Sequence, residues 1–243
     1  MEYTWITMGM PAKLNLPDGE DEATFLKIKS LYTTLDTQFS TYLETSEISR
    51  YNRHEISLTD HSELEWILSE CARTKQETEG YFDCQYGTNC DPSGLVKGYA
   101  ISQAAKMLRE AGHTNFLVEI AGDLQTSGNN EAGERWTIGI ENPFNRVEIV
   151  KVVTLSGQGL ATSGTSIHPD HIINPLTHQP AHEIASISVI AGDVYDADRM
   201  ATAAFAMGPK GIAFIEGLSG YDGYMVTLDK QGVMTTGFKQ YVQ

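Results

Sequence analysis

A carboxylate and a hydroxyl that could bind a cation together lie in the segment 196–202. Asp198 and Thr202 are one helical turn apart, so on a helix their side chains share one face. The residues at 203–207 favour a helix, which is expected to end at Gly208. Mg²⁺ prefers oxygen ligands and takes only a few of them from the protein, leaving the rest to water and substrate phosphates. The pair therefore predicts part of a magnesium site.

The same two residues have an ordinary structural interpretation. An Asp and a Thr near the start of a helix often cap its free N–H groups and offset its dipole. Taken alone, the spacing of Asp198 and Thr202 is more typical of such a capped helix than of a metal site. Both interpretations stay open at this point.

A second segment, 91–100, has the composition of an anion site. Gly94 and Gly98 allow close approach of the backbone to a ligand, and a helix that begins here would direct N–H groups at a phosphate. Lys97 adds a positive charge. The alternative is a Pro/Gly loop that opens a helix and leaves Lys97 in solvent. The segment by itself favours neither interpretation.

His171 is the candidate general base. It lies between a Pro-Asp pair and an Ile-Ile-Asn-Pro run, which indicates a short strand that leaves a loop, where a side chain can face a cleft. A histidine titrates near neutral pH and can accept a proton from a hydroxyl nucleophile. A structural or exposed histidine is the alternative. His168, His178 and His182 lie near it in the sequence, but their spacings match no common zinc pattern.

The sequence predicts a mixture of helices and strands to position the candidate site residues. Apolar residues recur every three or four positions over 21–43, and helices are also expected at 60–80, 95–111, 197–207 and 211–217. Asp60 and Glu63 form a possible capping box for the second of these helices. Strands are expected at 3–9, 12–16, 115–120, 135–141, 148–155 and 184–191, the last with the cleanest alternation, and a hairpin at 230–232. The order predicts an α+β fold.

Composition excludes several classes of protein. The chain has 243 residues, 41% of them hydrophobic, which is enough for a substantial core. Seventeen Lys and Arg face 32 Asp and Glu, for a net charge of −15, which opposes binding to nucleic acid or to anionic membranes. No window reaches the roughly 18 apolar residues of a membrane span, and the N-terminus has no signal pattern. We therefore expect a cytoplasmic protein without a membrane span.

Three cysteines, Cys71, Cys84 and Cys90, are present. Their odd number and the lack of a CxxC spacing argue against a disulfide framework and against a zinc site. The sequence predicts buried or incidental thiols.

Short motifs along nearly the whole chain resemble the ApbE family, the FAD:protein FMN transferases. Each motif is degenerate, but together they occur in the family's order. The matching segments are 8–10 (MGM), 39–42 (FSTY), 46–52 (SEISRYN), 80–83 (GYFD), 91–100 (DPSGLVKGYA), 121–123 (AGD), 161–164 (ATSG), 171–175 (HIINP) and 197–202 (ADRMAT). The resemblance implies an ApbE-like, T-fold-related α+β fold of mixed sheets with packed helices, in one compact domain over 1–243.

The resemblance also implies roles for particular residues. His171 would be the catalytic base, and the main-chain oxygen of Gly94 would hold Mg²⁺ together with Asp198 and Thr202. The residues that would contact FAD are Met8, Tyr42, Tyr81, Phe82, Asp83, Asp91, Lys97 and Ile172. Aromatic and thioether side chains suit a flat ring system. Tyr42 also falls on the apolar stripe of the 21–43 helix, so a place in the core remains open.

The implied reaction is Mg²⁺-dependent transfer of the FMN part of FAD to a Ser or Thr hydroxyl on an exposed loop of a client flavoprotein, with release of AMP. Two alternatives remain open: an FAD pyrophosphatase that gives FMN and AMP, and a non-catalytic FAD-binding protein. The chain departs from the family pattern at Ala121, Ser102, Asn174 and His178. None of these positions is a proposed metal ligand or base, so the departures bear mainly on loop shape.

Overall fold

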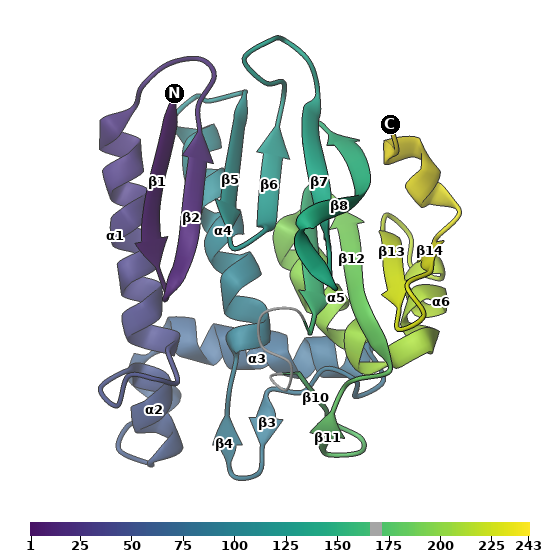
Figure 1. Cartoon of the computed structure of the whole chain (residues 1–243). Helices are drawn as coiled ribbons and strands as arrows, with labels where there is room; N and C mark the ends of the chain where they lie inside the picture. The colour runs from purple at the N-terminus through teal and green to yellow at the C-terminus, as the bar shows by residue number, and fades with distance from the viewer. Residues whose placement is uncertain (166–171) are drawn as a thin grey trace.

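The computed structural model describes residues 1–165 and 172–243. An eight-stranded antiparallel sheet in the order β1-β2-β5-β6-β9-β12-β13-β14 forms its centre (Figure 1). These strands are β1 (Glu2–Thr7), β2 (Met10–Asn15), β5 (Phe116–Ile120), β6 (Asp123–Ser127), β9 (Gly159–Gly164), β12 (Ile184–Ala191), β13 (Asp222–Thr227) and β14 (Gly232–Met234). Three two-stranded ribbons pair β3 (Gln85–Tyr86) with β4 (Asn89–Cys90), β7 (Trp136–Asn142) with β8 (Asn145–Leu155), and β10 (Ile173–Asn174) with β11 (Gln179–Pro180).

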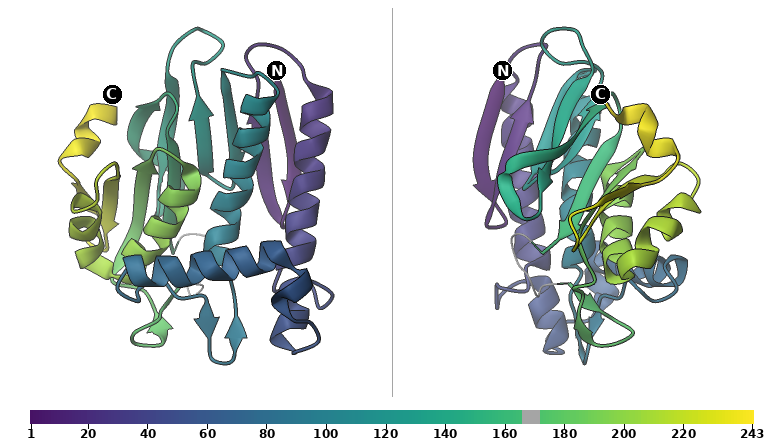
Figure 2. Two further views of the ribbon diagram at one scale, coloured as in Figure 1. Left: turned by 180° about the vertical axis from the view of Figure 1, so that it is seen from behind. Right: turned by 45° about the vertical axis from the view of Figure 1, so that its right-hand side comes forward.

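Helices cover one face of the sheet. The helices are α1 (Glu22–Phe39), α2 (Glu47–Asn52), α3 (Ser62–Glu77), α4 (Ser93–Glu110), α5 (Val194–Ala206) and α6 (Gly211–Glu216), with short 3-10 turns at Leu58–Asp60, Gly208–Lys210 and Gly237–Tyr241. Seen from behind, α1, α4 and α5 lie along the sheet, and α3 crosses below their lower ends (Figure 2). The β7–β8 ribbon lies on the opposite face (Figure 1). The expected α+β fold, with helices packed on sheets in one compact unit, is confirmed.

The core follows from the apolar patterns of these elements. The stripe of α1, with Ile28, Tyr32 and Leu35, is completely buried against the sheet, where Leu14 and Val118 meet it. A three- to four-residue spacing puts these side chains on one helix face, so their burial fixes which face turns inward. The amphipathic helix predicted at 21–43 is confirmed, although it ends at Phe39.

Strand β12 differs from its expectation. Its alternating sequence predicts one solvated face, but all eight residues are buried. Ile187 packs on the side of α5, and Ile190 packs toward β8 on the other side. Ser188 is buried with a hydrogen bond of 2.7 Å to the Thr162 hydroxyl, whereas the buried Ser186 hydroxyl has no hydrogen-bond partner among the described residues.

The start of α3 differs from the prediction, and three short elements were not predicted. The capping box expected at Asp60 and Glu63 is absent from the described structure, because α3 begins at Ser62 and its N-cap, His61, forms no side-chain cap. The Glu63 carboxylate instead accepts a hydrogen bond from the Tyr99 hydroxyl. The short helix α2 and the strands β6 and β9 were not predicted. They are too short for periodicity to separate them from loops.

The cysteine prediction was wrong. Cys71 of α3 and Cys84 form a disulfide with a Cα–Cα distance of 5.8 Å, and Cys90 is the free thiol. Both bridged residues are buried in a cluster with Phe82 and Leu95. An odd number of cysteines means that they cannot all be paired, but two of the three can still form a disulfide. The packing of the 78–84 loop against α3, which the sequence does not show, brings these two side chains together.

No helix in the described part of the chain is both long enough and apolar enough to cross a membrane.

Candidate functional site

A partly buried lysine, Lys97, lies near two buried aspartates where α4 and α5 meet the sheet. Lys97 Nζ of α4 is 2.6 Å from Asp123 Oδ2 at the start of β6. The Asp123 side chain is 1% exposed and that of Lys97 24%. Asp198 of α5 is also buried, and its Oδ2 accepts a hydrogen bond of 2.8 Å from the Gly98 N–H. The alternative in which Lys97 is simply solvated is therefore wrong.

The charges of this group act on one another. Burial, together with the negative charge of Asp123, raises the pKa of the Asp198 carboxyl to about 7, while Lys97 and the Gly98 N–H oppose the shift. Burial alone would lower the pKa of the Lys97 ammonium, but Asp123 and Asp198 raise it above its ordinary value. One cation thus compensates two buried carboxylates incompletely, and the site favours additional positive charge.

Gly98 allows this close contact between helices. A Cβ atom on Gly98 would lie 2.7 Å from Asp198 Cβ and 3.1 Å from the Tyr195 Cα. These distances are shorter than carbon atoms tolerate, so only glycine fits here. The glycine predicted to let the backbone approach a ligand instead lets α4 approach α5, and it orients Asp198 through its N–H.

The three residues expected to hold a metal come from the same helix pair. Gly94 lies in the first turn of α4, and a Cβ on it would be 3.4 Å from the Thr202 methyl carbon. Thr202 follows Asp198 by one turn of α5. Carbonyl, hydroxyl and carboxylate oxygens suit a hard cation such as Mg²⁺. Within residues 1–165 and 172–243, no three His, Cys, Asp or Glu side chains are grouped to hold a metal. A cation would therefore depend on these mixed oxygens and on the substrate.

The start of α5 decides between the two interpretations of Asp198. The N-cap of this helix is Asp193, whose side chain accepts a hydrogen bond from the Tyr195 N–H. Asp193 is fixed in turn by the Ser102 hydroxyl at 3.0 Å. Asp198 lies more than a turn inside the helix, so it cannot cap the helix, and the capping interpretation is wrong for it.

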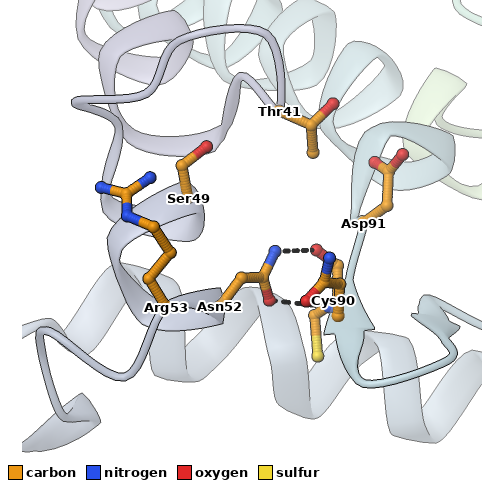
Figure 3. A pocket seen from close by; sticks show the side chains of 7 residues that line it. Thr41, Ser49, Asn52, Arg53, Cys90 and Asp91 are labelled. Carbon is orange, nitrogen blue, oxygen red and sulfur yellow. Dashed lines mark hydrogen bonds between the residues drawn. The ribbon is translucent and has the colours of Figure 1, made fainter.

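Two residues predicted to contact FAD, Asp83 and Asp91, precede α4 in the sequence. Asp91 precedes the helix, and its Oδ1 accepts a hydrogen bond of 3.0 Å from the Ser93 N–H. It also lines a surface pocket of about 310 Å³ together with Thr41 (Figure 3). Asp83 is held by an ion pair of 2.6 Å with Lys75.

Tyr81 and Phe82 belong to the cluster around the disulfide. Phe82 is buried, and Tyr81 is partly buried beside it. The position of a Cβ on Gly94 would be 3.0 Å from the Phe82 ring. Phe82 thus packs against the backbone of Gly94, the expected metal ligand, and its contact with FAD stays a prediction.

Met8 and Tyr42 lie on separate turns. Met8 and Gly9, both with positive φ, connect β1 to β2 at the end of the sheet nearest α3 (Figure 1). Met8 is partly buried against the core. Tyr42 follows the end of α1 and is 96% exposed, so the alternative that placed it in the core is wrong. The structure does not bring either residue into contact with Lys97 or Asp198.

The remaining two predicted residues are neighbours in the sequence. Ile172 is half-buried against the α5 cluster, and its carbonyl accepts a hydrogen bond from the Ala181 N–H. His171, the predicted base, lies outside the described residues. Its role stays a prediction.

Asp123 was not among the predicted site residues. Its signal was the Ala121-Gly122-Asp123 turn, in which Ala121 and Gly122 both have positive φ. This turn begins β6 with Asp123 directed inward, and Asp123 Oδ1 accepts a hydrogen bond of 2.9 Å from the Thr162 N–H. Without knowledge that α4 packs behind β6, a carboxylate after a turn cannot be distinguished from an exposed one.

Comparison with curated proteins gives relatives of one named activity. An FAD:protein FMN transferase of Klebsiella pneumoniae is 30% identical over 155 residues, 60% of this chain and 44% of that protein. One of Haemophilus influenzae is 26% identical over 263 residues, 79% of this chain and 76% of that protein. The match thus spans less than half the length of the first relative.

Solved structures share the fold. A flavin transferase ApbE from Vibrio cholerae has a TM-score of 0.86 at 23% identity and covers 100% of this chain and 99% of that chain. The ApbE protein from Thermotoga maritima also has a TM-score of 0.86, at 20% identity, with 100% and 99% covered. The ApbE-like fold expected from the resemblance is confirmed.

The family model described as the ApbE family matches residues 8–91 and 85–225, which include the Lys97 and Asp198 site. The chain is a member of the ApbE family.

Proposed function

We propose that this chain, as one ApbE-like domain over 1–243, transfers the FMN part of FAD to a Ser or Thr hydroxyl of a client flavoprotein and releases AMP. The named activity of its relatives supports the reaction class. The observation that carries the proposal is the pair of buried aspartates, Asp123 and Asp198, with the partly buried Lys97, beside Gly94 and Thr202. A protein with net charge −15 needs such a local site to accept a dinucleotide.

The reaction exchanges one bond at phosphorus for another. The client hydroxyl oxygen forms a P–O bond to the phosphate of the FMN part, the bond between that phosphorus and the bridging oxygen breaks, and AMP leaves with the bridging oxygen. The hydroxyl proton passes to a base, for which His171 is proposed. Lys97 would stabilise the diphosphate by its charge, and Asp123 holds the lysine through an ion pair of 2.6 Å.

Gly94, Asp198 and Thr202 would hold Mg²⁺, and the incompletely compensated carboxylates fit such a cation. When bound, the ion would offset the negative charge that develops as the bond to AMP breaks. Asp198 is directed by the Gly98 N–H, so its position is set before any ligand binds.

Intact mass measurement tests the proposal. A flavoprotein subunit with an exposed Ser/Thr loop is incubated with this protein, FAD and Mg²⁺, and AMP is followed in parallel. We expect the subunit to gain the mass of FMN less water, and EDTA to prevent the gain. Release of AMP and free FMN, with no client labelled, would support the pyrophosphatase instead. If the protein binds FAD but releases no AMP, the result would support the non-catalytic FAD-binding protein.

Two variants separate the proposed roles. Asp198→Ala should abolish metal-dependent turnover, because the carboxylate ligand is lost. His171→Ala should retain FAD binding and lose transfer, because the base acts only on the nucleophile. Transfer at the parent rate in either variant would contradict that residue's role.

A further inference from the structure

The Asn52 side chain is bound to the backbone of a residue 38 positions away. Its Nδ2 donates to the Cys90 carbonyl at 2.9 Å, and its Oδ1 accepts from the Cys90 N–H at 2.8 Å (Figure 3). One amide thus binds both backbone groups of Cys90. Only one orientation of the amide satisfies both bonds, since the carbonyl needs a donor and the N–H an acceptor.

These bonds lie on the free edge of a small ribbon. Cys90 pairs with Gln85 across β3 and β4, and the next residue, Asp91, donates its N–H to the Cys84 carbonyl at 2.7 Å. Strand β4 is only two residues long, and such a strand holds its place poorly without a partner on its other side. Asn52 takes the place of that partner.

The position of Cys90 also determines the position of the start of α4. Asp91 is the next residue, and its carboxylate binds the Ser93 N–H at the start of α4. The same helix carries Gly94 and Lys97. A shift of β4 would therefore move Asp91 and the first turn of α4 together.

The other end of α2 is equally well held. Ser46 is completely buried, its hydroxyl donates to the Ser40 carbonyl at 2.7 Å, and the same oxygen accepts from the Ser49 N–H at 3.1 Å. Ser40 follows α1 directly and leads into Thr41 and the exposed Tyr42. The short helix α2 therefore connects the Tyr42 loop at one end to Asp91 at the other.

We propose that Asn52 is a positioning residue: it sets Asp91 and the start of α4 at a fixed place relative to the Tyr42 loop, so that FAD meets both segments at once. The proposal rests on the proposed function for the identity of the ligand. It assigns a role to the last residue of the 46–52 motif. Asn52 acts through Cys90 and is not expected to touch the reacting atoms.

The test compares Asn52→Asp and Asn52→Ala with the parent. Asn52→Asp keeps the size of the side chain and the oxygen that accepts from the Cys90 N–H. It replaces the donor Nδ2 with a carboxylate oxygen that repels the Cys90 carbonyl. We expect both variants to raise the Kd and the KM for FAD about tenfold, because a well-made amide pair is lost. At saturating FAD, kcat should fall less than kcat/KM, since Asn52 itself does not touch the reacting atoms. Amide exchange at Cys90 and Asp91 should accelerate.

Asn115→Ala is the matched control. Asn115 also binds a distant backbone group, the Asn129 N–H at 2.8 Å, and the Asp18 carboxylate at 3.0 Å. It lies before β5, at the end of the sheet away from α3 (Figure 1). This variant should lose thermal stability and keep the parent Kd for FAD, which separates positioning from general destabilisation.

An unchanged Kd for FAD in folded Asn52→Asp protein would overturn the proposal, as would a loss of kcat with KM unchanged. If the parent binds FAD but releases no AMP, the transferase proposal fails. The comparison of Kd values and of amide exchange still decides the role of Asn52 in that case.

Discussion

At the scale of single residues, the site depends on Lys97 having two carboxylates close to it. Asp123 forms the direct ion pair, and Asp198 is bound by the Gly98 N–H. A buried charge that loses its partner is costly, because water does not replace the lost contact. The two aspartates therefore differ in role: Asp123 fixes the lysine, and Asp198 is the carboxylate that we propose holds a cation.

Asp123→Asn should weaken the fold. Among the residues that the structure describes, the variant leaves Lys97 with Asp198 as its one nearby carboxylate, and we expect a loss of about 1–3 kcal/mol in the free energy of unfolding. Urea denaturation measures this loss. In a double-mutant cycle with Lys97→Met, the effect of Asp123→Asn should shrink, and equal effects in the two backgrounds would show that the pair is not coupled.

The pKa of Asp198 predicts a pH dependence for the metal-free protein. Its pKa rises from 3.8 to about 7 on folding, so between these values the folded state binds a proton that the unfolded state does not. Stability should therefore fall as the pH rises through this window, by about 2–4 kcal/mol, and then level off.

Denaturation in EDTA at pH 5 and pH 8 tests this prediction. Asp198→Asn is the control, because its neutral amide removes the titration and should flatten the difference. A parent protein that is more stable at pH 8 than at pH 5 would contradict it.

At the scale of elements, the contact between α4 and α5 forms the site, and several contacts hold α5 in place. Asp193 caps the N-terminus of α5, and the Asn174 amide donates to the Ala206 carbonyl at its other end. Arg199 is buried and forms ion pairs with Asp196 on α5 and with Glu77 on α3. These contacts fix the rotation of α5, and so they fix where Asp198 points.

Gly98→Ala should force α4 and α5 apart. In an exposed helix the change would stabilise by about 1 kcal/mol through helix propensity. Here the new Cβ would lie 2.7 Å from Asp198 Cβ, so we expect a net loss of about 2 kcal/mol from overpacking.

Thermal unfolding of Gly98→Ala measures the sign of this effect, with Gly94→Ala as the comparison. The closest atoms to a Cβ on Gly94 are side-chain carbons of Phe82 and Thr202, at 3.0 and 3.4 Å, which can move more easily than backbone. We expect a smaller loss of stability there. A more stable Gly98→Ala protein would show that α4 and α5 are not in close contact.

At the scale of the whole molecule, the disulfide joins α3 to the loop that carries Tyr81 and Phe82. Cys71 and Cys84 close a loop with a sequence separation of 13. Disulfides are typical of proteins that fold in oxidising compartments. The cytoplasmic location that the sequence predicts stays a prediction.

Replacing both bridged cysteines, as Cys71→Ala with Cys84→Ala, should lower the stability. Loop-closure entropy for about 15 residues predicts a loss of about 3 kcal/mol. For a chain of this size that corresponds to a fall of about 6–12 °C in Tm, which calorimetry measures. Cys90→Ser should change Tm little. A parent protein whose Tm does not respond to reductant would indicate that the bridge does not form.

The sequence by itself determined the long helices and the family. Periodic apolar positions locate α1, because burying one face of a helix needs only local spacing. Local start, stop and propensity signals indicate α3, α4 and α5. The pairing of Asp198 with Thr202 on one face follows from the same geometry, and both residues lie where predicted. Short motifs in order were enough to indicate the family.

Only the tertiary structure decided which of these side chains meet. Three contacts join residues 13 to 38 positions apart in the sequence: the Asp123–Lys97 ion pair, the Asn52–Cys90 hydrogen bonds and the Cys71–Cys84 disulfide. Their residue types, an acid, an amide and a thiol, are common on protein surfaces. Nothing local distinguishes them, since their partners come close only when the helices pack on the sheet. Local spacing thus determined the helices and the residues they present, and the packing of α4 and α5 determined which charges become buried together.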